Sequence, residues 1–187
     1  MKYIDCLSVV ALYIEDKNLY DCLLYKGAIS EETQKQIDNL CAFIDIVINE
    51  ICCEYFPITK TEKITATNNK IEYEKLSERV VDVRKVKKNG KKINYDLFAY
   101  YIGVDGDGEY EVCYDYSPKG YSGNIQDTIA LYGRITPRIV GFGAMAEYCL
   151  ANNRFDEAIT YDKMFKDALI GVEKRRGKLK IKQRRWE

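Results

Sequence analysis

The sequence predicts an α+β fold: an α-helical bundle with an inserted small antiparallel β-domain, either a sandwich or a barrel, and an extended C-terminal arm. Apolar residues recur every three or four positions in residues 3–56 and 136–173, as on one face of a helix. From residue 59 to 116 apolar and polar residues alternate, as along half-buried strands. All three prolines, Pro57, Pro118 and Pro137, lie where the pattern changes.

These patterns divide the 187 residues into five segments, long enough together to bury a sizeable core. The predicted segments are N-terminal helices of the bundle (1–56), an inserted antiparallel β-domain (57–117), an irregular connecting loop (118–135), a C-terminal helix pair of the bundle (136–173) and a basic C-terminal arm (174–187).

The N-terminal segment contains two helical patterns. The first covers residues 3–26, with Gly27 as a stop, and the sequence leaves open whether residues 16–18 divide it into two helices. The second begins at Ser30, a good N-cap followed by two acidic residues, and Pro57 ends it.

The β-domain is expected to hold four to six short antiparallel strands. The predicted strands cover Thr61–Thr67, Val80–Val86, Ile93–Tyr101 and Tyr110–Tyr116, with turns at Asn68-Asn69, Asn89-Gly90 and Asp105–Gly108. After Pro118, a long Gly-rich, Ser-rich and Tyr-rich connection follows, which at that length is either functional or ordered by a partner.

The helix pair begins at Thr136, a natural N-cap, with Pro137 at the first helical position. Residues 138–150 are apolar nearly all round, which indicates burial on several sides. Asn152-Asn153 allow a tight reversal into a second helix. This second helix has one apolar stripe, formed by Ala158, Tyr161, Phe165, Ala168, Leu169 and Val172.

Composition argues against several classes of function. The seven cysteines form no CxxC pair and the chain lacks histidine, so we expect no metal site and no complete disulfide framework. Without a histidine base, a nucleophile elbow or a P-loop, we expect neither an enzyme nor a cofactor. The apolar runs are too short for membrane spans and no secretory signal opens the chain, so we expect a reducing cytoplasm and no membrane partner.

Three local patterns have ordinary structural interpretations. Gly141–Ala146 satisfies the dinucleotide pattern G-x-G-x-x-A, but it lies inside a helix, so we expect close helix packing instead. Asp105, Asp107 and Glu109 resemble a fragment of a calcium loop, and we expect a hairpin turn. Residues 151–161 resemble one tetratricopeptide helix hairpin; a single copy leaves a peptide-binding module as a weaker alternative, with an exposed groove on the helix pair.

The charge is unevenly distributed. Residues 174–187 carry eight Lys or Arg and one Glu, so their charge is +7 and that of the remaining chain is −7. Within this tail, Lys178–Lys182 alternates basic and apolar residues, which favours an extended arm with Leu179 and Ile181 on one side. A solvated basic end is the plain alternative, but Trp186 favours a partner. Such an arm can add as a strand to another subunit's sheet, or contact nucleic-acid phosphates.

A set of runs extends from about residue 35 to the C-terminus. They are Asn49–Pro57, Ile71–Tyr73, Tyr110–Tyr114, Arg134–Arg138, Ala146–Leu150, Phe155–Ala158 and Lys182–Trp186. In this order they resemble the head-to-tail connector (adaptor) proteins of tailed bacteriophages, especially those of phages that infect Firmicutes-like hosts. The order of the elements carries the resemblance more than any single motif.

The resemblance implies a structural, dodecameric ring of identical subunits in the neck of the virion, assembled in the cytoplasm of the host bacterium. The ring would join the portal protein to a tail or stopper protein, with DNA in transient passage through its lumen. The portal-binding residues that the resemblance implies are Lys178, Leu179, Lys180, Ile181, Lys182, Arg184, Arg185 and Trp186. The alternative is a nucleic-acid-binding protein that uses the same basic tail.

Overall fold

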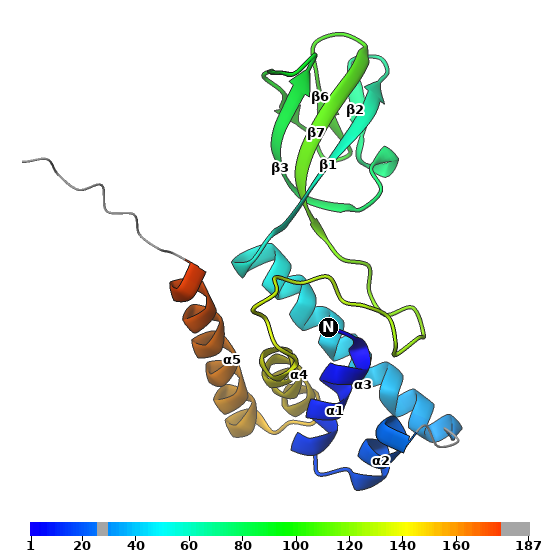
Figure 1. Cartoon of the computed structure of the whole chain (residues 1–187), viewed down its shortest axis with the longest axis vertical. Helices are drawn as coiled ribbons and strands as arrows, with labels where there is room; N and C mark the ends of the chain where they lie inside the picture. The colour runs from blue at the N-terminus through cyan, green and yellow to red at the C-terminus, as the bar shows by residue number, and fades with distance from the viewer. Residues whose placement is uncertain (26–29, 177–187) are drawn as a thin grey trace, which may run out of the picture.

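The computed structural model describes residues 1–25 and 30–176, in which a helical body carries a β-module at one end (Figure 1). This arrangement confirms the predicted α+β fold with an inserted β-domain. The helices of the body are α1 (Tyr3–Tyr13), α2 (Lys17–Tyr25), α3 (Glu31–Glu50), α4 (Pro137–Ala151) and α5 (Phe155–Arg176).

The open question about residues 16–18 is resolved in favour of two helices. The chain reverses between α1 and α2 at Glu15, which has a positive φ of 58°. Asp16 then accepts a hydrogen bond of 2.9 Å from the backbone N–H of Leu19 and so caps the start of α2. The same hydrogen bond is the main reason that the pKa of Asp16 lies below its ordinary value.

The long helix α3 begins and ends as predicted. The Ser30 hydroxyl accepts a hydrogen bond of 3.1 Å from the backbone N–H of Thr33, which satisfies one of the free donors of the first turn. At its other end the helix continues into a π-helical turn, η1 (Ile51–Tyr55), directly before Pro57. This end of the helix leads into the β-module (Figure 1).

Helix α4 is buried because it packs against α1, α3 and α5. A Cβ atom on Gly141 would lie 2.7 Å from a methyl carbon of Val9, so the small residue permits the contact between α4 and α1. The predicted N-cap is wrong in one respect: Thr136 precedes the helix, but its side chain makes no capping hydrogen bond. Pro137 at the first helical position has no backbone N–H, so one fewer N–H group at the start of the helix needs a hydrogen-bond acceptor.

The predicted reversal and the predicted apolar stripe of the helix pair are confirmed, but α5 runs through Arg176, three residues beyond the predicted boundary at residue 173. Asn153 has a positive φ of 58° and reverses the chain between α4 and α5. The predicted stripe of α5 faces the body, where Ala158, Phe165, Leu169 and Val172 are buried. Because α4 lies within a bundle of helices, the pair is not a free-standing helical repeat.

The β-module contains two small antiparallel sheets that share one core. The first has the strand order β1-β7-β3-β4 and the second β2-β6-β5. The strands are β1 (Ile58–Ala66), β2 (Lys70–Glu72), β3 (Arg79–Lys88), β4 (Lys91–Lys92), β5 (Asp96–Leu97), β6 (Tyr101–Gly103) and β7 (Gly108–Ser117), with a short 3-10 helix, η2 (Tyr73–Lys75), after β2.

Two turn predictions are confirmed, and one strand prediction is wrong. Asn68-Asn69 and Asn89-Gly90 all have positive φ, as tight hairpins require. The expected strand Ile93–Tyr101, in contrast, is interrupted: within this range only β5 and Tyr101, the first residue of β6, are in strands, and β5 and β6 form a hairpin in the second sheet, whereas β4 just before it belongs to the first. Alternation of side chains does not show where a chain crosses between sheets, so the described residues hold seven strands instead of four to six.

The connection 118–135 lacks regular structure, as predicted, and it lies against the helical body. The backbone N–H of Ile4 donates to the carbonyl of Ile125 at 2.9 Å, and that of Ile129 donates to the carbonyl of Met1 at 2.8 Å. Ile129 and Ile135 are buried in the body's core. The chain itself therefore supplies the contacts that position this connection.

Candidate functional site

The residues predicted to bind a portal lie outside the described part of the chain. Lys178, Leu179, Lys180, Ile181, Lys182, Arg184, Arg185 and Trp186 all follow Arg176, the last residue of α5. Their role therefore stays a prediction. The described residues nevertheless contain two surfaces suited to protein contacts, one on each half of the molecule.

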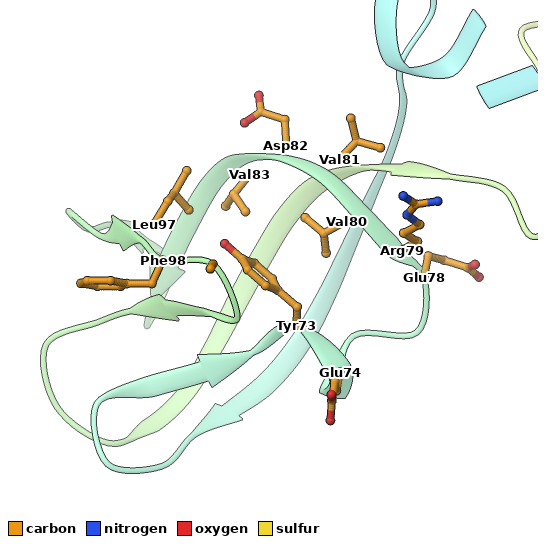
Figure 2. Close-up of a pocket in the computed structure, with 11 residues that line it drawn as sticks. Tyr73, Glu74, Glu78, Arg79, Val80, Val81, Asp82, Val83, Leu97 and Phe98 are labelled. Carbon is orange, nitrogen blue, oxygen red and sulfur yellow. The ribbon is translucent and has the colours of Figure 1, made fainter. Parts of the chain in front are cut away.

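The first surface is a groove of about 480 Å³ in the β-module, between the first half of β3 and residues 97–99 (Figure 2). Tyr73, Val80 and Val83 point into it, whereas Val81 and Asp82 point away from it on the other face of β3. We call this the β3 groove. It lies where one sheet ends and the other begins, so the sandwich is open along this side.

Large apolar side chains are exposed beside the β3 groove. Leu97, Phe98 and Tyr100 expose 52%, 49% and 83% of their surface, respectively. The ring of Phe98 stacks on that of Tyr101, with centroids 4.6 Å apart, which holds it in place despite its exposure. Exposed apolar groups that lie close together are typical of interaction surfaces.

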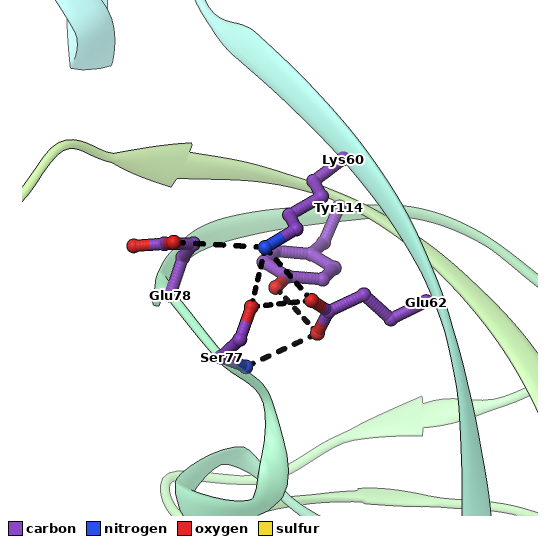
Figure 3. A network of polar contacts seen from close by, with 5 residues as sticks. All are labelled: Lys60, Glu62, Ser77, Glu78 and Tyr114. Carbon is purple, nitrogen blue, oxygen red and sulfur yellow. Dashed lines mark hydrogen bonds and ion pairs between the residues drawn. The ribbon is translucent and has the colours of Figure 1, made fainter. Parts of the chain in front are cut away.

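A polar network fixes the chain where it enters β3 (Figure 3). The ammonium group of Lys60 lies 2.9 Å from the carboxylate of Glu62 and 3.6 Å from that of Glu78. Glu62 also accepts hydrogen bonds from the backbone N–H of Ser77 at 3.1 Å and the hydroxyl of Tyr114 at 3.0 Å. These contacts hold Ser77 and Glu78 against β1 and β7 and so position one end of the groove.

This network strongly favours the ionised form of Glu62. Burial raises the pKa of Glu62, but hydrogen bonds from Ser77, Lys60 and Tyr114 outweigh burial and lower the pKa to about 2. A carboxylate with that pKa is charged throughout the neutral range and cannot exchange a proton there. We therefore interpret the network as structural support for the groove.

The second surface is a groove of about 450 Å³ on the helical body, lined by α1, α4 and α5. Its floor contains stacked aromatic rings: Tyr13 lies 5.7 Å from Phe142, and the guanidinium of Arg138 lies 5.3 Å from the same ring. Phe155 and Ile159, on α5 beside this groove but not among the residues that line it, expose 58% and 67% of their surface. We call these exposed residues the α5 face.

The described residues do not bring together the usual parts of a metal or thiol site. Among residues 1–25 and 30–176, no three His, Cys, Asp or Glu residues are grouped so that they could hold a metal ion. Burial raises the pKa values of Cys6, Cys41 and Cys52 to about 12, so these thiols stay protonated at neutral pH. Asp107 accepts a hydrogen bond from the backbone N–H of Asn69 at 2.8 Å, which gives it a structural role in the predicted turn.

Within the part of the chain that the structure describes, no helix combines the length and the apolar character needed to cross a bilayer. Comparison with protein-family models and with curated proteins finds no match for this chain.

Sequence reasoning missed the β3 groove. A signal was present, because Val80-Val81 and the run from Leu97 to Tyr101 are apolar without alternation. In a strand, consecutive apolar residues place at least one of them on the solvent side of the sheet. The exposed apolar residues that line the groove come from these two runs.

Proposed function

We propose that this chain is the structural subunit of a head-to-tail adaptor of a tailed bacteriophage. Identical subunits form a dodecameric ring in the virion neck, which assembles in the cytoplasm of the host bacterium. The arm 178–186 docks on the portal protein, and a tail or stopper protein binds the opposite side. The subunit's role is structural and not catalytic.

The observation that carries this proposal is the presence of two different apolar surfaces on well-separated parts of one subunit. The β3 groove lies in the module, and the first turn of α5, where the α5 face begins, lies at the end of the body away from the module (Figure 1). A closed ring of identical subunits with head-to-tail contacts needs two such different surfaces on each subunit. The order of elements that resembles phage adaptors supports the same assignment.

The charge distribution is consistent with DNA passage. Without residues 174–187 the chain has a net charge of −7, and residues 1–56 alone hold ten acidic and four basic residues. A lumen with excess negative charge repels the phosphates of passing DNA, so DNA would not be retained.

Two experiments test the adaptor. Negative-stain electron microscopy of the purified protein, alone and with the portal protein encoded in the same genome, should show rings; a monomer under both conditions would overturn the proposal. In phage assembly, deletion of Lys178–Glu187 should give filled heads without tails. Normal tail joining by that variant would refute portal docking through the arm.

The second candidate is a nucleic-acid-binding protein, which the +7 charge of residues 174–187 favours. It predicts binding to generic duplex DNA with an affinity that falls steeply as salt concentration rises, because bound phosphates release counterions. Removal of residues 174–187 should then abolish binding. Rings without DNA binding would favour the adaptor.

A further inference from the structure

One edge of strand β3 is open over its first half. Strand β7 pairs with β3 along its whole length on one side. On the other side β4 pairs only with Lys87 and Lys88, and two single hydrogen bonds reach the carbonyls of Val86 and Val83. Among the described residues, no strand covers this edge from Arg79 to Asp82. An uncovered strand edge is a template for pairing with another chain.

The inner side of the same edge is apolar. Val80, Val83 and the ring of Tyr73 point into the β3 groove, and Leu97 and Phe98 form its opposite wall (Figure 2). A strand added between these walls would cover the core where the two sheets separate. Apolar side chains on one face of the added strand would then become buried, and this burial favours its binding.

The outer side of the edge is acidic. Asp82 is exposed and points away from the groove, and Glu74 is exposed at the groove's lower end (Figure 2). Glu78 adds a third carboxylate, which is already paired with Lys60 at 3.6 Å, and Arg79 is the one basic residue that lines the groove among the described residues. The groove therefore suits a strand with apolar residues on one face and basic residues on the other.

We infer that the β3 groove binds the segment Lys178–Lys182 of a neighbouring copy of this chain, which adds to the sandwich as an antiparallel or parallel strand. The segment alternates three lysines with Leu179 and Ile181, so one of its faces is apolar and the other is positively charged. The aliphatic face meets Val80, Val83 and Leu97. The lysines lie on the side of Asp82.

The added segment is one residue longer than the open edge. The open part of β3, Arg79–Asp82, holds four residues, because the carbonyl of Val83 already accepts a hydrogen bond of 2.7 Å from Tyr95, so four of the five residues Lys178–Lys182 can pair with it. The register of β3 against β7 shifts twice, between Val80 and Asp82 within the open stretch and between Val83 and Lys85 just beyond it, and such bulges bend the strand. The inference narrows the portal contact of the proposed function: of residues 178–186, only residues 183–186 are left for the portal protein.

This inference rests on the ring of the proposed function and names the contact that links its subunits. In this arrangement the two different surfaces of the ring contact are the β3 groove and the arm, and the α5 face is left for a separate contact. Because the exchanged strand connects each copy to the next, loss of the groove should weaken the ring without unfolding the subunit.

The first test uses charge reversal in the full-length chain. Combining Glu74→Lys with Asp82→Lys should weaken subunit association at least about tenfold in analytical ultracentrifugation, and adding Lys180→Glu and Lys182→Glu should restore it. The matched control combines Glu31→Lys with Glu109→Lys, two exposed carboxylates outside the groove, and should leave association unchanged. Thermal unfolding followed by circular dichroism confirms that each variant folds.

The second test locates the arm directly. A photocrosslinking residue at position 181 is activated in a mixture of isotopically heavy and light chains, and crosslinked peptides are mapped by mass spectrometry. Heavy-to-light crosslinks to residues 73–99 support the inference. Crosslinks within one chain, or to another region, overturn it.

The strand exchange and the adaptor proposal can be refuted separately. Wild-type rings that are unaffected by the groove variants would refute the strand exchange and leave the adaptor proposal standing. A wild-type chain that stays monomeric with and without the portal would refute both.

Discussion

Val47 on α3 occupies the space that a side chain at Gly143 on α4 would need. A Cβ atom on Gly143 would lie 2.7 Å and 2.8 Å from the two methyl carbons of Val47, and 3.3 Å from the ring of Phe165 on α5. The glycine therefore permits three helices to meet at one level of the body. A branched side chain fixed in a helix has little freedom to move aside.

We expect Gly143→Ala to lower the free energy of unfolding by about 1–3 kcal/mol, because the added methyl group overpacks the junction. Gly171→Ala on α5 is the matched control, since a Cβ atom there meets nothing within 4 Å. It should raise stability by about 0.5–1 kcal/mol through its better helix propensity. Urea denaturation measures both changes, and equal stability of the two variants would contradict the packing interpretation.

Glu62 should make the stability of the β-module depend on pH. Its pKa is lowered from 4.5 to about 2 in the folded chain, so its contribution is fully present above pH 4.5 and is lost as the pH falls toward 2. Glu62→Gln should therefore reduce stability at neutral pH by about 1–3 kcal/mol and flatten the acid transition over that range.

The control for this prediction is Glu109→Gln, which removes an exposed carboxylate 3.9 Å from Lys63. An exposed ion pair of this kind contributes only about 0–1 kcal/mol to the free energy of unfolding. Thermal unfolding at a series of pH values compares the two variants. A Glu62→Gln variant with the acid transition of the wild type would show that the network does not stabilise the module.

Asp45 should hold the irregular connection against the body. Its carboxylate accepts a hydrogen bond from the hydroxyl of Tyr3 at 2.5 Å and another from the backbone N–H of Tyr121 at 2.8 Å. Asp45→Ala should cost about 1–3 kcal/mol, because it leaves partly buried donors without this acceptor. Amide hydrogen exchange at Tyr121 should also accelerate, whereas the control Asp167→Ala, which removes an exposed carboxylate on α5, should leave that exchange rate unchanged.

The cysteines should differ in reactivity. Burial keeps Cys6, Cys41 and Cys52 protonated and out of contact with reagents, whereas Cys53 is exposed. Iodoacetamide at about pH 8 should modify Cys53 first in the folded chain, and urea should open the buried thiols to the reagent. Peptide mass spectrometry of samples quenched at a series of times measures the order in which the cysteines are modified. Rapid modification of Cys52 under native conditions would contradict the packing of η1.

The sequence alone determined the local elements, because the signals for them are local. Spacing of apolar residues, the Ser30 cap, the Asn89-Gly90 turn and the position of Pro57 each depend on neighbours a few residues away, and the structure bears each of them out. The basic arm is also a property of the sequence, and its docking stays a prediction.

Tertiary structure decided the rest, because it depends on where distant segments meet. The chain crosses from one sheet to the other after β4, and this crossing leaves the edge of β3 uncovered beside Leu97 and Phe98. The pattern of apolar residues in the sequence does not indicate such a crossing. Alternation shows which residues of a strand share a face, but it does not show which strand lies beside it. The β3 groove thus became visible only in the folded chain.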